Sequence, residues 1–181
     1  MMRKESFFSL YQNETLQMLE LPYENRDLSM LVVLPRKVDG LGDVETSVDI
    51  AMLEQWRKAM KRQNVLVNLP KFKMTSQFSL RKVLTAMGMG LAFSDKADFS
   101  GMSTRESLCI SAVIHKAFVD VNEQGTEAAA ATAVLIAPTS APIVTTPVPF
   151  IADHPFLFLI CDNRTGSILF MGRVADPSNT K

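Results

Sequence analysis

The segment "EQGTEAAAATA" (residues 123–133) sets four alanines between two threonines, close to a glycine, and offers no strong nucleophile. In a strand, its side chains alternate between two faces. One face then carries Thr126, Ala128, Ala130 and Thr132, and the other carries Glu127, Ala129, Ala131 and Ala133. Small side chains can enter a sheet that helices already cover, where larger ones would overpack. Because Gly125 has the backbone freedom of a hinge, the pattern predicts an arm that is exposed in one state and a strand in another.

An alanine-rich helix is the alternative for this segment, because alanine has the highest helix propensity. The two threonines disfavour a helix, and prolines at 138, 142, 147 and 149 prevent it from extending. The continuation "VLIAPTSAPIVTTPVP" (134–149) is apolar, proline-rich and uncharged. Loops this long without structure of their own are usually functional or disordered.

Strands dominate the rest of the sequence. Apolar runs at 16–23 and 28–35 flank the polar turn "ENRD" and predict an antiparallel hairpin. We expect further strands at 65–74 and 107–125, and a last pair around the tight turn "DNRTG" (162–166). Short turns between successive strands favour antiparallel sheets.

Two segments have helical spacing. The first covers 44–60, with Asp49 as a plausible cap, and the second covers 79–90, capped by Ser79 and stopped by Gly88 and Gly90. The sequence therefore predicts an α+β fold made mainly of antiparallel sheets with a few short helices. It contains no internal repeat and no clear domain boundary.

Composition excludes several classes of protein. The chain has 181 residues, 47% of them hydrophobic, and its 19 basic residues balance its 19 acidic ones. A globular core is therefore expected, with no nucleic-acid partner and no membrane span. The N-terminus has no signal-peptide pattern. Two N-x-T sequons, at Asn13 and Asn163, lean weakly towards an extracellular protein, and the compartment stays open.

No residue pattern indicates catalysis. G-x-S-x-G, Walker, H-E-x-x-H and G-x-G-x-x-G motifs are all missing from the sequence. Cys109 and Cys161 fit neither a zinc pattern nor a disulfide scaffold, and we expect two buried free thiols. The prediction is a protein that is not an enzyme and has no metal or cofactor.

Several blocks of the sequence resemble the serpins, a family whose members mostly inhibit serine proteases by a change of fold. The similar blocks span residues 1–177, in family order, and include "LSMLVVLP", "LPKFKM", "ISAVIHKAFVDVNEQGTEAAAATA" and "HPFLFLICDNRTGSILFMGRVADP". Serpins are about twice this length. The resemblance implies that residues 1–181 are the C-terminal portion of a single serpin domain with an incomplete fold, whose missing N-terminal half is a required partner.

The resemblance also implies a reactive-centre loop at about 125–149, exposed on the surface. Its scissile bond would join Thr139 to Ser140, after the bait residues Ile136, Ala137 and Pro138. The implied hinge comprises Glu123, Gly125, Thr126, Glu127, Ala128, Ala129, Ala130, Ala131 and Thr132. A threonine before the cleaved bond suits a serine protease with a small apolar primary pocket, such as elastase-like or subtilisin-like enzymes.

Such a protein traps its target protease as a covalent acyl-enzyme. The cut loop inserts into the central sheet, and the oxyanion hole of the displaced protease is distorted. The inhibitor itself contributes no catalytic group.

Two further residues match family positions that control sheet opening. Lys71 would pair with Glu123 at the top of the central sheet; the alternative is two unrelated solvated charges. His115 would join a hydrogen-bond cluster whose partners lie in the missing half; the alternative is a satisfied core histidine.

Two other functions stay open. A non-inhibitory serpin acting as a carrier or chaperone tends to have bulky, charged or proline residues in the hinge. Between Gly125 and Thr132 this sequence has one such residue, Glu127, which matches the inhibitory pattern. An inactive fragment is the other alternative, because most strands of the central sheet would be missing.

Overall fold

The fold is that of a computed structural model, which describes residues 1–122 and 146–178. The chain separates into two compact units, one formed by residues 1–72 with 121–181 and the other by 73–120. The sequence contains no linker that would reveal this division. The prediction that residues 1–181 belong to one domain stays a prediction.

Most of the predicted site lies outside the described residues. This holds for the hinge from Glu123 to Thr132, the bait residues and the bond between Thr139 and Ser140. The described residues therefore include the strand before the hinge and the C-terminal end of the predicted loop, from residue 146.

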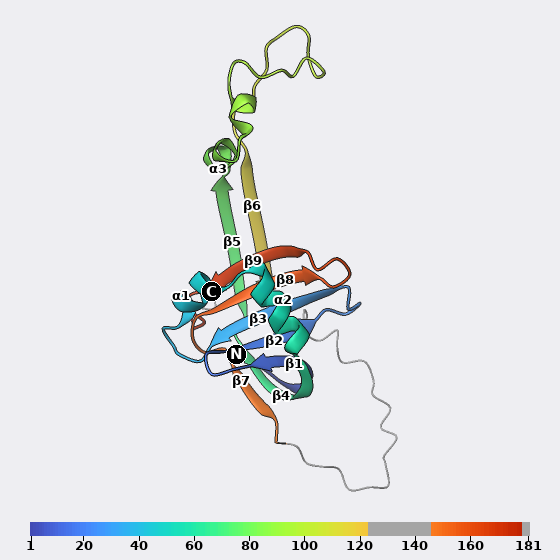
Figure 1. The fold of residues 1–181 in the computed structure, drawn as a ribbon, viewed down its shortest axis with the longest axis vertical. Helices are drawn as coiled ribbons and strands as arrows, with labels where there is room; N and C mark the ends of the chain where they lie inside the picture. The colour runs from blue at the N-terminus through green and yellow to red at the C-terminus, as the bar shows by residue number, and fades with distance from the viewer. Residues whose placement is uncertain (123–145, 179–181) are drawn as a thin grey trace. The chain divides into compact units, whose positions relative to one another are not determined.

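The first unit is built on a seven-stranded sheet with the order β7-β4-β1-β2-β3-β8-β9 (Figure 1). All neighbouring strands are antiparallel except β4 and β7, which are parallel. Both predicted hairpins are confirmed, as β2–β3 and β8–β9. The strands are β1 (Met2–Gln12), β2 (Leu16–Pro22), β3 (Leu28–Pro35), β4 (Lys61–Leu69), β7 (Val148–Ile151), β8 (Phe156–Asp162) and β9 (Ile168–Val174).

Apolar side chains cover both faces of the central strands, so β3 and β8 are buried almost throughout. On one face, Trp56 from a helix is buried and stacks on Tyr11 of β1, with 6.1 Å between ring centroids. On the other face, Phe72 lies against Phe156 and Phe158, at 6.0 and 5.2 Å between centroids. Burial on both faces explains why these strands read as continuous apolar runs.

The predicted helix over 44–60 is two helices, α1 (Leu41–Ser47) and α2 (Ile50–Ala59). The chain is extended at Val48 and Asp49. Asp49 is confirmed as a cap, because its Oδ1 accepts a hydrogen bond of 2.7 Å from Met52 N. This cap starts a new helix instead of continuing the old one.

The predicted strand at 65–74 is wrong in its limits. It is two strands, β4 ending at Leu69 and β5 (Phe72–Ser79), separated by Pro70 and Lys71. Proline has no N–H for a ladder and fixes its own φ, which favours a break at this point.

The second unit contains a two-stranded sheet of β5 and β6 (Ile114–Val121). Lys73 Nζ lies 3.0 Å from Asp120 Oδ2 at one end, and Leu80 N donates to Val113 O at the other, so the strands run antiparallel. The strand predicted from residue 107 begins only at Ile114, because the segment before it makes no ladder.

The helix predicted over 79–90 is shorter than expected. It is α3 (Arg81–Ala86), followed by the 3-10 helix η1 (Met89–Phe93). Ser79 is not its cap: the N-cap is Leu80, without a side-chain hydrogen bond. Gly88 follows the end of α3 as predicted, with a φ of 101°, a left-handed conformation that favours glycine. Gly90, the other predicted stop, lies within η1 instead.

The side chain of Asp162 stabilises the turn between β8 and β9 by accepting hydrogen bonds from the turn's backbone. Asp162 Oδ1 accepts hydrogen bonds from Arg164 N at 2.8 Å and Thr165 N at 3.2 Å. These backbone N–H groups hold the pKa of the Asp162 carboxyl below its ordinary value. Gly166 closes the turn with a φ of 74°.

The two thiols differ in environment. Cys161 is buried as predicted, but Cys109 is exposed, since it lies in an irregular segment of the second unit. Burial raises the pKa of the Cys161 thiol; the Arg57 charge opposes this shift and the Glu20 charge adds to it.

Cys109 is therefore expected to react with a thiol reagent such as DTNB at least about tenfold faster than Cys161, because the reactive form is an accessible thiolate. The rate of colour release from the native chain measures this. The variant Cys109→Ser should lose the fast phase and keep the slow one. A fast phase that persists in this variant would contradict the assignment.

Candidate functional site

The described part of the predicted site is the pair of strands that flank residues 123–145. β6 ends at Val121 before that segment, and β7 begins at Val148 after it. β7 occupies an edge of the seven-stranded sheet, beside β4 (Figure 1). The C-terminal end of the predicted loop is therefore an ordered edge strand.

Side chains and backbone fix β7 firmly to the sheet. Phe150 is fully buried, and Ala152 N donates to Asn68 O at 2.9 Å. The buried amide of Gln17 donates through Nε2 to Pro149 O at 3.2 Å. Pro149 has no N–H to offer a further strand, which suits an edge position.

The strand that precedes the predicted loop, β6, is much more exposed than β7. In β6, Ile114 and Phe118 are 64% and 59% exposed, and in β5 Phe78 is 55% exposed. Within residues 73–120, Phe93 is the one hydrophobic side chain that is buried. A unit of this size with so little buried apolar surface does not supply a core of its own.

The residues predicted to control sheet opening lie in this region. Lys71 is exposed between β4 and β5, and its predicted partner Glu123 lies outside the described residues, so the pair stays a prediction. His115 lies on β6 and is exposed among the described residues, which do not include a surface that covers β6, so the alternative of a core histidine stays open. Its role in a cluster with the missing half stays a prediction.

Sequence reasoning missed two sets of polar contacts in the first unit. His154 lies with Nδ1 2.7 Å from Asp153 Oδ1 and Nε2 2.7 Å from Pro35 O, so it links β3 to the segment between β7 and β8. The turn residue Asn163 joins several segments through its amide. The "DNRTG" motif indicated a turn, but nothing in it indicated those distant partners.

No group of histidine, cysteine or carboxylate side chains in the described residues could hold a metal ion. No helix in the same residues is long and apolar enough to cross a membrane.

The serpin family model, described as "serine protease inhibitor", matches residues 1–177. Bovine Serpin B10 is 48% identical over 162 residues, covering 88% of this chain and 40% of the relative. An uncharacterized serpin-like protein of Thermococcus kodakarensis is 45% identical over 179 residues, covering 99% of this chain and 42% of the relative.

Among solved structures, uncleaved ovalbumin superposes with a TM-score of 0.78 at 33% identity. The superposition covers 96% of this chain and 46% of ovalbumin. The chain thus spans less than half the length of these relatives, and its matching region has their fold. The α+β fold implied by the serpin resemblance is confirmed, and the chain belongs to the serpin family.

Proposed function

We propose that this chain is the loop-bearing portion of a serine protease inhibitor that traps its target by loop insertion. The observation that carries the proposal is the hinge, whose Thr126, Ala128, Ala130 and Thr132 face is small throughout, in a chain that belongs to the serpin family. Such a face suits entry into a covered sheet. Human Serpin B4 is a further relative, 44% identical over 172 residues.

The strands on either side of the loop support this proposal in different ways. β7 is anchored by Phe150 and Gln17, which would hold the C-terminal end of a cut loop in place. β6 and β5 form a narrow two-stranded sheet with exposed apolar side chains, which suits a sheet that gains strands.

The target that we propose is a serine protease with a small apolar primary pocket. Cleavage would occur between Thr139 and Ser140, after the bait Ile136, Ala137 and Pro138. The serine would attack the Thr139 carbonyl and form an acyl-enzyme, and loop insertion would then stop its hydrolysis. The chain would supply no catalytic group, metal or cofactor.

An inactive fragment is a second candidate, favoured by two observations. The chain spans only 40–46% of the proteins named above, and the exposed side chains of β5 and β6 require a covering that residues 73–120 lack. Inhibition therefore depends on the polypeptide that corresponds to the unmatched half of those relatives.

The test is to refold the chain with the N-terminal half of the Thermococcus relative and incubate the pair with pancreatic elastase or trypsin. We expect an SDS-stable band of summed mass with elastase and none with trypsin. In the variant Thr139→Arg, trypsin should become the trapped enzyme, because its pocket takes arginine or lysine.

Cleavage by either enzyme without any stable band, both for the unchanged chain and for Thr139→Arg, would contradict inhibition and favour the non-inhibitory or inactive alternatives. The same mixture without the N-terminal half is the control, and it should give cleaved chain only.

A further inference from the structure

A pocket of about 240 Å³ lies in the first unit, where β1, β2 and the start of β4 meet the turns before β3 and after β8. It has no part in the proposed inhibition. Its lining combines two arginines, Arg26 and Arg62, and one carboxylate, Glu20, with polar groups of Ser29 and Asn163 and the ring of Phe7. This volume is well above the roughly 10–15 Å³ that one water molecule needs, so the pocket has room for one small organic molecule.

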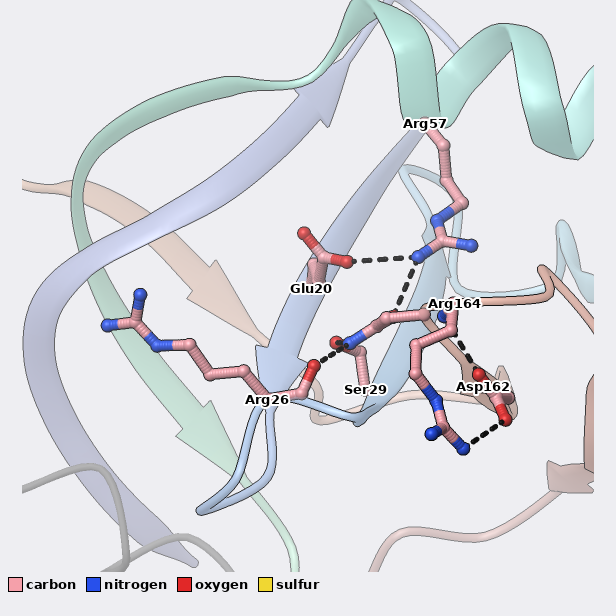
Figure 2. A network of polar contacts seen from close by, with 7 residues as sticks. Glu20, Arg26, Ser29, Arg57, Asp162 and Arg164 are labelled. Atoms are coloured by element: carbon pink, nitrogen blue, oxygen red, sulfur yellow. Dashed lines mark hydrogen bonds and ion pairs between the residues drawn. The ribbon is translucent and has the colours of Figure 1, made fainter.

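Asn163, which lines this pocket, is the centre of a network of polar contacts. Figure 2 labels its partners Arg26, Ser29 and Arg57. Asn163 Nδ2 donates to Arg26 O at 2.8 Å and to Ser29 Oγ at 2.7 Å, and its Oδ1 accepts from Arg57 Nη2 at 2.9 Å. Asn163 N also donates to Asp27 O at 2.7 Å. This part of the lining is therefore fixed in advance, which lowers the cost of ordering it around a ligand.

Arg26 has an unusual backbone conformation. Its φ is 56°, and among the described residues it is the one non-glycine with a positive φ. A hydrogen bond from Arg26 N to Tyr23 O and the contact of Arg26 O with Asn163 hold it there. Figure 2 shows its side chain extending away from Glu20 and Asp162. A strained residue held by its surroundings is typical of binding sites.

The charges around the pocket do not cancel. Glu20 lies 3.3 Å from Arg57, so its negative charge is already paired. The guanidinium groups of Arg26 and Arg62 have no carboxylate partner within 1–122 and 146–178. Two guanidinium groups at one pocket favour a carboxylate or a phosphate, which each can bind through two parallel hydrogen bonds.

We propose that this pocket binds a small organic anion, with its carboxylate or phosphate between Arg26 and Arg62 and a short apolar body against Phe7. Phe7 is 58% exposed at this point, so an apolar body would remove its ring from water. The two arginines would orient the ligand through its anionic group, and the Phe7 ring would contact its apolar body.

The test is titration of the isotope-labelled 181-residue chain, followed by NMR, with benzoate and phenyl phosphate as probes. Saturable shifts are expected at the amides of Phe7, Ser9 and Asn163, with a dissociation constant below about 1 mM for the better probe. Whichever of the two binds more tightly identifies the anionic group. Benzyl alcohol, which is similar in shape and neutral, should bind at least about tenfold more weakly.

Two variants locate the site. Arg26→Asn keeps a residue that tolerates a left-handed backbone and removes the charge, and Arg62→Gln removes the other charge. Each should weaken binding about fivefold or more. The matched control is Arg3→Gln, since Arg3 is an exposed arginine on β1 outside the pocket, and it should change the affinity less than twofold.

Four results would overturn the proposal: no saturable shift, benzyl alcohol binding as well as benzoate, equal effects of Arg3→Gln and Arg62→Gln, or inorganic phosphate binding as tightly as phenyl phosphate. The last would remove any role for the apolar body. The dispersion of the variant spectra shows that each variant is folded. Inhibition of a protease is not needed for any of these measurements.

Discussion

The variant Ala130→Arg, refolded with an N-terminal serpin half, is expected to be cut by its target protease and to trap almost none of it. Ala130 belongs to the face of small side chains that would enter the sheet. An arginine there would bring an unpaired charge into the sheet, which costs several kcal/mol. If about 3 kcal/mol of this cost appears in the barrier to insertion, insertion slows by about two orders of magnitude. Hydrolysis of the acyl-enzyme then occurs first. The fraction of SDS-stable complex against cleaved chain measures the effect.

Ala129→Arg is the matched control for this variant. In the proposed inserted strand, Ala129 would lie on the opposite face, together with Glu127, where the sequence already carries a charge. Trapping by Ala129→Arg should stay within about threefold of the unchanged chain, since the outer face leaves the arginine in water. Equal loss of trapping in both variants would show that the two faces are not distinct, and the strand interpretation of the hinge would be wrong.

Local patterns predicted those parts of the fold that local chemistry decides. The β2–β3 and β8–β9 hairpins follow from apolar runs around short polar turns, and Asp49 caps α2 as its position before an amphipathic run indicated. The interruption at Pro70 was missed because apolar residues continue on both sides of it, although they shift from Val67 and Leu69 to Phe72 and Met74, one position out of phase. The segments before and after Pro70 become β4 and β5 in different sheets, and their neighbouring strands lie far away in the sequence.

Periodicity also failed for the segment before β6. The residues from 107 to 113 read as a strand, yet they have no ladder partner in the described chain, and Cys109 among them is exposed. A sequence pattern records which side chains suit burial, but burial itself needs a second surface. For residues 73–120, the exposed Ile114 and Phe118 show that this surface lies outside the unit.

The candidate site also combines features that are local in the sequence with contacts between distant segments. The hinge and the bait are local properties of one segment, so the sequence could predict them, although the described residues do not test them. The Asn163 network could not be predicted, because Asn163 and Arg26 lie 137 positions apart and Asn163 and Arg57 lie 106 apart. Contacts at that separation arise from the order of strands in the sheet.

The variant Gly172→Ala is expected to destabilise the first unit by about 1–3 kcal/mol, because its new methyl group has no room. Gly172 of β9 lies opposite Phe158 of β8. A Cβ at residue 172 would lie 2.7 and 2.8 Å from two ring carbons of Phe158. That ring is 2% exposed and packs on Phe72, so it has little freedom to move away. Urea unfolding, followed by the fluorescence of Trp56, the one tryptophan in the chain, measures the free energy of unfolding.

Gly42→Ala is the matched control, since a Cβ at residue 42 of α1 meets nothing within 4 Å. Alanine favours a helix over glycine by up to about 1 kcal/mol, so this variant should be neutral or stabilising. Phe158→Leu removes ring atoms that the new methyl would meet. The double variant Phe158→Leu with Gly172→Ala should therefore lose less stability than the sum of the two single changes. If the two losses simply add, the methyl group and the ring do not compete for the same space, and the close approach of β9 to Phe158 is not what requires glycine at residue 172.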